Sequence, residues 1–206
     1  SLLGQDTLYN EGLIIKTSIN TKLQKIANET LLNGLIKQDK KLGWRGVISN
    51  LNNISIIEKN FKIGIKNPFP NKWKISQVET IHSDYLIVTD KRGLIQKVDL
   101  TIDSNIWLKN EKFNIGDIFF TELVAGNLLI RQIPLVNGAI IVMDPHSGNI
   151  LALSGGFSFA ISEFNRATQA KRQPGSAFKP FVYISALKEG YNPSTLILDA
   201  PYVVDQ

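Results

Sequence analysis

Apolar side chains recur at helical spacing near the start of the chain, over about residues 21–36. A helix with such a stripe buries it against other elements of the fold. Thr21 and Gln24 have the spacing of a capping box, which marks a helix N-terminus. The pattern therefore predicts one amphipathic helix whose stripe consists of Leu23, Ile26, Ala27, Leu31 and Leu35.

Between about residues 43 and 135 the pattern changes to short runs of β-forming residues. The hairpin turn Asp90–Gly93 separates two of these runs, and a further turn and strand follow over residues 113–123. About five strands in such a span predict a small closed β-barrel. The clearest runs lie at residues 74–81, 85–89 and 94–98.

A second hairpin is predicted over residues 138–156, where two apolar strands flank a turn that contains Pro and Gly. Farther on, Pro174 and Gly175 predict another turn, and the apolar residues behind them have helical spacing. We therefore expect a helix to start near Ser176.

Ser176 and Lys179 lie three residues apart at this predicted helix start, and therefore on one face. A Ser hydroxyl is a weak nucleophile at neutral pH until a base takes its proton, and a Lys partly buried among apolar residues can be neutral enough to do so. The helix N-terminus adds unpaired N–H groups that suit a developing oxyanion. The pattern favours a serine nucleophile with a lysine base.

The same Ser-x-x-Lys spacing recurs at Ser185 and Lys188, so the spacing alone is weak evidence. Ser185 lies inside the predicted helix, where a hydroxyl usually bonds to a preceding carbonyl. Ser176 follows a Pro-Gly turn, although an ordinary helix-starting Ser would occupy the same position. Context therefore favours Ser176 as the nucleophile.

The sequence around this motif resembles the transpeptidase domain of class A penicillin-binding proteins, the bifunctional cell-wall synthases, and most closely the 1A type. The resemblance rests on Gly138–Gly156, Phe164–Ala170 and Arg172–Tyr183, and it is dense from about residue 138 to 201. Residues Tyr9–Ile19 resemble the family's lead-in to that domain more loosely.

This resemblance implies an α+β chain in three parts. Residues 1–42 would be the lead-in of the transpeptidase domain, with a strand at about 12–19 and then the amphipathic helix packed on the domain's sheet. Residues 43–135 would be an OB-like five-stranded β-barrel insert. Residues 136–206 would be the N-terminal part of an incomplete, β-lactamase-like transpeptidase domain.

The signature of such enzymes also contains S-D-N and K-T-G motifs. Ser18–Asn20 has the shape of the first but precedes Ser176 in the chain, and no Lys-Thr-Gly occurs in the sequence. The resemblance therefore implies that the chain is a fragment, inactive alone, of a longer parent that also has a glycosyltransferase domain.

The function of that parent also follows from the resemblance. Ser176 would attack the D-Ala-D-Ala end of a peptidoglycan stem peptide, with Lys179 as the candidate base, and the acyl group would pass to an amine on a neighbouring strand. β-Lactams would acylate the same Ser, and cell-wall regulatory proteins would be further partners. The parent would be anchored by an N-terminal helix outside this chain, with this region on the periplasmic side of the bacterial inner membrane.

Composition excludes several kinds of site. The 206 residues contain no Cys and only two His, so disulfides and Cys-ligated zinc are excluded, and neither a metal nor a cofactor is expected. The formal net charge of +5 suits nucleic-acid binding, but the basic residues do not cluster. The densest basic run, Lys37–Arg45, is expected to be a solvated helix end and loop.

A non-catalytic binding module is the alternative function. An OB-like domain binds single-stranded nucleic acid through a basic groove with exposed aromatic side chains. The aromatic residues available here are expected to be core, so we expect no nucleic-acid partner and leave peptidoglycan or a regulatory protein as the ligand. These residues are Trp73, Tyr85, Trp107, Phe113, Phe119 and Phe120.

Overall fold

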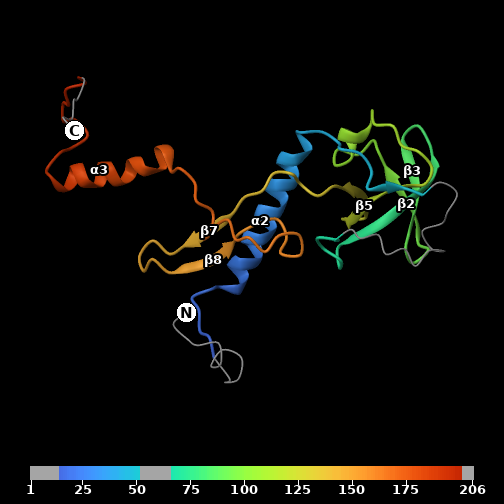
Figure 1. Ribbon diagram of the computed structural model, residues 1–206, viewed down its shortest axis with the longest axis horizontal. Helices are drawn as coiled ribbons and strands as arrows, with labels where there is room; N and C mark the ends of the chain where they lie inside the picture. The colour runs from blue at the N-terminus through green and yellow to red at the C-terminus, as the bar shows by residue number, and fades with distance from the viewer. Residues whose placement is uncertain (1–13, 52–65, 201–206) are drawn as a thin grey trace. The chain divides into compact units, whose positions relative to one another are not determined.

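The computed structural model describes residues 14–51 and 66–200 of the chain. The chain divides into two compact units, Ser1–Gln169 and Ala170–Gln206 (Figure 1). The first unit contains the long helix, a six-stranded antiparallel sheet and a two-stranded hairpin. The second unit contains the predicted Ser-Lys pair.

The predicted amphipathic helix is confirmed as α2 (Thr21–Lys40), which extends four residues beyond the predicted end. Its N-terminus differs from the predicted capping box. The N-cap is Asn20, whose Oδ1 accepts hydrogen bonds from the N–H groups of Lys22 (3.0 Å) and Leu23 (3.1 Å). Asn is among the best N-cap residues, so it displaces Thr21 from that role.

Gln24 does not take part in a capping box, because its side chain hydrogen-bonds to the edge of a strand instead. The hairpin consists of β7 (Ile140–Met143) and β8 (Ile150–Ser154). Gln24 Nε2 donates to the Leu153 carbonyl and Gln24 Oε1 accepts from the Leu153 N–H, both at 2.9 Å. One amide side chain thus satisfies both backbone groups of Leu153 on the open edge of β8.

The strand expected at residues 12–19 is wrong over its described part, since residues 14–19 form no strand; residues 12 and 13 lie outside the described residues. Two groups at the end of this segment contact β8. Ser18 Oγ donates to the Ile150 carbonyl (2.7 Å), and the Asn20 N–H donates to the Leu151 carbonyl (2.8 Å). Because α2 begins at residue 21, the segment is too short to extend the ladder further.

The strands predicted from β-forming runs are confirmed, and they form a Greek key. β2, β3 and β4 follow one another as hairpins, and β5 returns to pair with β2 on its other side. β5 also pairs with β1 and β6. The strands are β1 (Ser49–Asn50), β2 (Trp73–Ile81), β3 (Tyr85–Asp90), β4 (Ile95–Asp99), β5 (Asp117–Val124) and β6 (Asn127–Arg131).

The predicted closed barrel is not found. In the part of the chain that the structure describes, no ladder joins β4 to β6, although the two strands are neighbours. Asn105, fully buried just before the short 3-10 helix η1 (Ile106–Leu108), lies between them. Its Nδ2 donates to the carbonyls of Asp99 (2.8 Å) and Leu128 (3.0 Å), and its Oδ1 accepts from the Ile130 N–H (3.2 Å).

Replacing Asn105 by Ala should therefore lower the free energy of unfolding by about 2–3 kcal/mol, because buried backbone groups on β4 and β6 lose their partner. Urea unfolding of the 206-residue chain, followed by circular dichroism, measures this change. Asn110→Ala, at an exposed position nearby, is the control and should change stability by less than about 0.5 kcal/mol. Equal effects of the two substitutions would contradict the role of Asn105.

The sheet is packed on both faces along β5. Phe119 belongs to the core on one face, together with Val78, Leu86 and Ile130. Phe120 belongs to a second core, which also contains Leu35 of α2, Trp73 and Phe157. The ring centroids of Phe120 and Trp73 are 5.6 Å apart. The continuous run Ile118, Phe119, Phe120 in the sequence explains this, since a strand buried on both faces needs no polar alternation.

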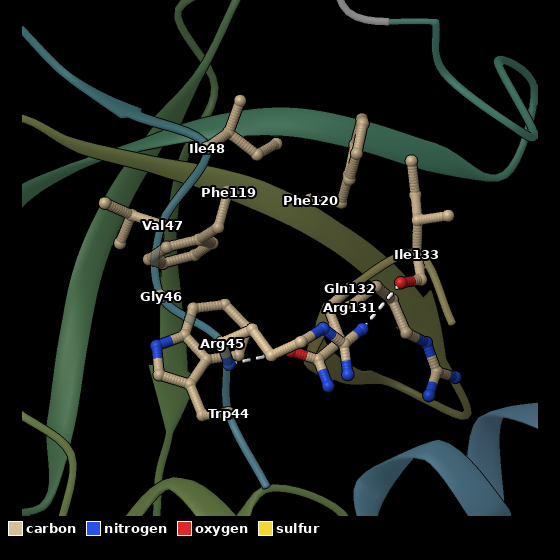
Figure 2. Close-up of a pocket in the computed structure, with 10 residues that line it drawn as sticks. All are labelled: Trp44, Arg45, Gly46, Val47, Ile48, Phe119, Phe120, Arg131, Gln132 and Ile133. Carbon is tan, nitrogen blue, oxygen red and sulfur yellow. Dashed lines mark hydrogen bonds between the residues drawn. The ribbon is translucent and has the colours of Figure 1, made fainter. Parts of the chain in front are cut away.

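The run Lys37–Arg45 is a helix end and loop, as expected, and it is exposed at Lys37, Lys41 and Arg45. Asp39 is the exception, because it is buried in a polar junction. Asp39 is 1% exposed, and its carboxylate accepts hydrogen bonds from Arg45 Nη1 (3.0 Å), Arg45 Nη2 (2.9 Å), Gln132 Nε2 (2.9 Å) and the Leu135 N–H (2.9 Å). Figure 2 shows Arg45 beside Gln132 at a pocket of ≈ 180 Å³, where Arg45 Nη2 also donates to the Ile133 carbonyl (2.6 Å). We call these contacts the Asp39 junction.

Lys40 beside this junction is half-buried, with Nζ 5.1 Å from the centroid of the Trp107 ring and 2.6 Å from the Ser104 carbonyl. Burial, and then repulsion by Arg131, lower the pKa of Lys40 to about 8. The unfolded chain keeps this proton to higher pH, so the folded chain gains stability as pH rises from about 8 towards about 10.5.

Relative to Lys40→Met, the unsubstituted chain should therefore gain about 1 kcal/mol of unfolding free energy between about pH 7.5 and pH 10, a value reduced because the amine is partly solvated. Urea unfolding of both proteins at the two pH values measures the difference. Lys37→Met, at an exposed position on the same helix, is the control and should show no such trend. If the unfolding free energy of the unsubstituted chain relative to Lys40→Met fell as pH rose, the lowered pKa of Lys40 would be contradicted.

Candidate active site

The second unit places the Ser-x-x-Lys motif at a helix start, as predicted. The 3-10 turn η2 (Gly175–Phe178) leads directly into α3 (Lys179–Lys188). Gly175 has φ 53°, a left-handed conformation that favours Gly, and Pro174 precedes it with φ −67°. The Pro-Gly pair thus sets the direction in which Ser176 enters the helix.

Ser176 lies in the η2 turn and Lys179 is the first residue of α3. At the start of a helix the backbone N–H groups lack an intrahelical acceptor, which applies to the N–H of Ser176. The Ser176 side chain caps neither η2 nor α3, whose N-caps are Pro174 and Phe178. The hydroxyl is therefore not committed to the capping role that an ordinary helix-starting Ser would have.

Lys179 differs from the expectation in one respect. Both Ser176 and Lys179 are exposed, and no hydrogen bond joins Ser176 Oγ to Lys179 Nζ in the described residues. The partial burial that would favour a neutral lysine is therefore absent here, because the second unit buries no residue of α3. The structure brings the two residues to one helix start without assembling a proton-transfer pair.

Ser185 has the position expected for the rival motif. It lies inside α3, and its carbonyl accepts a hydrogen bond from the Glu189 N–H (3.2 Å). A hydroxyl in a helix interior has no unpaired backbone N–H groups beside it, so it lacks the oxyanion-binding donors that a helix start supplies.

The large apolar side chains of α3 itself project from all sides of the helix, and they are exposed. A helix that is apolar all round is normally buried in a core. The exposed fractions of its large apolar residues lie between 52% and 63%, for Phe181, Val182, Tyr183, Ile184 and Leu187. The helix thus has the sequence of an interior element.

The stretch Phe164–Ala170, to which the sequence analysis gave no structural role, fixes the end of β8. Gly155 lies so close to Asn165 that an added Cβ would come within 2.1 Å of Asn165 Oδ1. The Arg166 N–H donates to the Gly155 carbonyl (2.8 Å), and Asn165 Oδ1 accepts from the Ala167 N–H (3.0 Å). Only Gly fits at 155, but a Gly-Gly pair in sequence gives no hint of its distant partner.

The described residues offer no metal site, since no three His, Cys, Asp or Glu side chains gather there. None of the helices described is long and apolar enough to cross a membrane.

Comparison with known proteins agrees with these features. The sequence profile described as "Penicillin binding protein transpeptidase domain" matches residues 138–206, which contain the Ser-x-x-Lys helix. Penicillin-binding protein 1A of Rickettsia bellii is 37% identical over 98% of this chain and 26% of its own length. Penicillin-binding protein 1A of Pseudomonas aeruginosa is 34% identical over 95% of this chain and 25% of its own length.

The chain belongs to the penicillin-binding protein 1A family. The crystal structure of penicillin-binding protein 1A from Haemophilus influenzae matches with a TM-score of 0.78 and 28% identity, over 100% of this chain and 31% of that one. The chain therefore has a penicillin-binding protein 1A fold of mixed helix and antiparallel sheets, and it spans about a quarter of the length of the curated relatives that it matches.

Proposed function

We propose that this chain is part of a peptidoglycan synthase in which Ser176 is the acylated nucleophile and Lys179 its base. The observation that carries the proposal is the Ser-x-x-Lys pair at a helix start inside residues 138–206, the part matched by the transpeptidase profile. The uncommitted Ser176 hydroxyl and the apolar sequence of α3 support it, since a helix that is apolar all round is normally buried in a larger domain.

In the proposed reaction Lys179 Nζ takes the proton of Ser176 Oγ as the oxygen attacks the carbonyl between the two terminal D-Ala residues of a stem peptide. The N–H of Ser176 donates to the resulting oxyanion. The C–N bond then breaks, and D-alanine leaves with the proton as a free amine. An amine of a neighbouring strand attacks the ester, loses a proton, and restores the Ser176 hydroxyl as the cross-link forms.

β-Lactams would stop this sequence at the acyl-enzyme. The 206-residue chain alone would be inactive, because Lys179 is exposed and makes no hydrogen bond with Ser176. We propose a parent protein that also has glycosyltransferase activity and a membrane anchor, with this region on the periplasmic side of the inner membrane and regulatory proteins among its partners. The division at residues 1–42, 43–135 and 136–206 stays a prediction.

A second proposal concerns the sheet, which we infer to be an OB-type binding module. The Greek-key order of β5, β2, β3 and β4 favours it, as does the proximity of β4 and β6. A single-stranded nucleic-acid ligand is disfavoured because Trp73, Phe119 and Phe120 are at most 2% exposed, so they cannot stack on bases.

Covalent labelling tests the main proposal. The full-length protein that contains this chain is incubated with fluorescent penicillin, digested, and analysed by mass spectrometry. The adduct should lie on the peptide that contains Ser176. An adduct on another residue, or no adduct in a folded protein that cross-links peptidoglycan, would refute the assignment of Ser176.

A further inference from the structure

A groove lies on the sheet between the β3–β4 turn and the β5–β6 turn. Its residues are far from the Ser-x-x-Lys helix in the sequence. The groove consists of two depressions, of ≈ 220 Å³ and ≈ 420 Å³, that share Lys74, Asp90 and Arg92. One wall is the β3–β4 turn and the other is the end of β5 and the start of β6. The two depressions adjoin at these residues, and we call them together the basic groove.

The basic groove carries a net positive formal charge, because four basic residues (Lys72, Lys74, Lys91 and Arg92) and two acidic ones (Asp90 and Glu122) line it. In the described chain neither Lys72, Lys74 nor Arg92 forms an ion pair, and Lys72 and Arg92 are exposed. The two carboxylates of the groove are already occupied. Glu122 accepts from Arg131 Nε (2.7 Å) and from the Trp73 indole N–H (3.2 Å).

Asp90 is occupied within its own turn. Its Oδ1 accepts from the N–H groups of Arg92 (2.8 Å) and Leu94 (3.1 Å), which fixes the β3–β4 turn. In the described residues neither carboxylate forms an ion pair with Lys72, Lys74 or Arg92, which leaves these three cations without an acidic partner there. A ligand with carboxylates would supply it, through charge-assisted hydrogen bonds.

The walls of the basic groove are apolar. Leu94 is 54% exposed and Leu123 is 60% exposed, and they come from the two opposite turns. The amide side chains of Asn71 and Gln96 add donors and acceptors for a backbone. The one aromatic ring at the groove, Trp73, is 1% exposed among the described residues, so the groove offers no stacking platform for a base or a sugar.

We propose that the basic groove binds a short peptide that carries carboxylates beside small apolar side chains. Given the proposed function, on which this step rests, the ligand of that chemistry is the peptidoglycan stem peptide. The groove would then be a site for stem peptides that is separate from Ser176. It would hold cell-wall material near the enzyme without taking part in acyl transfer.

The test uses the 206-residue chain and nuclear magnetic resonance titration. The probes are muropeptides from digested peptidoglycan, a synthetic peptide of alternating Ala and Glu, and the matched peptide of alternating Ala and Gln. Both acidic ligands should shift the amide signals of Lys74, Arg92 and Leu94 saturably, and the neutral peptide should not. Raised salt should weaken the binding.

Paired substitutions locate the binding. Lys72→Gln with Arg92→Gln should weaken muropeptide binding by about five- to tenfold, because two exposed charge contacts are lost. Lys109→Gln with Lys112→Gln removes the same charge at exposed positions outside the groove and should leave the affinity within about twofold. Unchanged stability of both variants shows that the fold is intact.

Three results would overturn the proposal: no saturable binding, equal binding of the neutral peptide, or equal weakening by the two pairs of substitutions. Binding of the synthetic acidic peptide without muropeptides would overturn the stem peptide as the ligand. Failure of the proposed function is distinguishable, because penicillin labelling of the full-length protein depends on Ser176 and not on Lys72 or Arg92.

Discussion

Ser176→Ala should abolish covalent labelling by fluorescent penicillin in the full-length protein that contains this chain. The ester cannot form without the Ser176 hydroxyl, and no other hydroxyl occupies the start of α3. Lys179→Ala should slow acylation by about 10²- to 10⁴-fold, the usual contribution of a general base. Stopped-flow or gel measurements of the acylation rate provide both values.

Ser185→Ala is the matched control, because it removes a hydroxyl from the second Ser-x-x-Lys match in the same helix. We expect an acylation rate within about twofold of the unsubstituted protein, since Ser185 has no free N–H groups beside it. Labelling that survives Ser176→Ala and disappears with Ser185→Ala would show that the nucleophile had been assigned to the wrong serine.

Asp39→Ala should destabilise the 206-residue chain by about 3–5 kcal/mol, the cost of removing one partner of a buried ion pair. The substitution leaves the Arg45 guanidinium without its carboxylate and the Gln132 amide and Leu135 N–H without their acceptor. Urea unfolding measures the loss.

Asp103→Ala serves as the control, because it removes the same charge from an exposed position. It should change stability by less than about 0.5 kcal/mol. If Asp39→Ala were equally mild, the Asp39 junction would contribute little to stability, and α2 and the sheet would be held by the apolar core around Leu35 and Phe120 alone.

The strands and the long helix could be predicted because their signals are local. β2, β3 and β4 lie within one residue of the predicted ranges, and β7 and β8 lie inside the predicted hairpin, since each is a short β-forming run. The predicted helix end falls four residues short because Lys37–Lys40 is polar, and a polar run does not show that Asp39 is buried.

The remaining features depend on residues far apart in the sequence. The contact of Asp39 with Leu135 spans 96 positions and that of Gln24 with Leu153 spans 129. Asn105 is an ordinary loop residue in the sequence, and only the fold shows that it replaces a ladder between β4 and β6. No periodicity or motif encodes such pairings.

The site was predictable in part for the same reason. The Pro-Gly turn and the helix after it are local, so the position of Ser176 and Lys179 at a helix start follows from the sequence. The surroundings of Lys179 depend on what covers α3, which is not a local property. In this structure Lys179 is exposed, and its role as the base stays a prediction.

The Asp39 junction also has a meaning for how such a chain can be assembled in evolution. The chain enters the sheet at Arg45 and leaves it at Gln132, and the Arg45 N–H donates to Gln132 Oε1 at 3.2 Å. A module whose two ends meet in this way can be inserted into a host domain, or lost from it, without separating the host segments on either side. The Asp39 junction joins the two ends of the sheet module. The sequence of the sheet could therefore change without altering the packing of α2 on the hairpin.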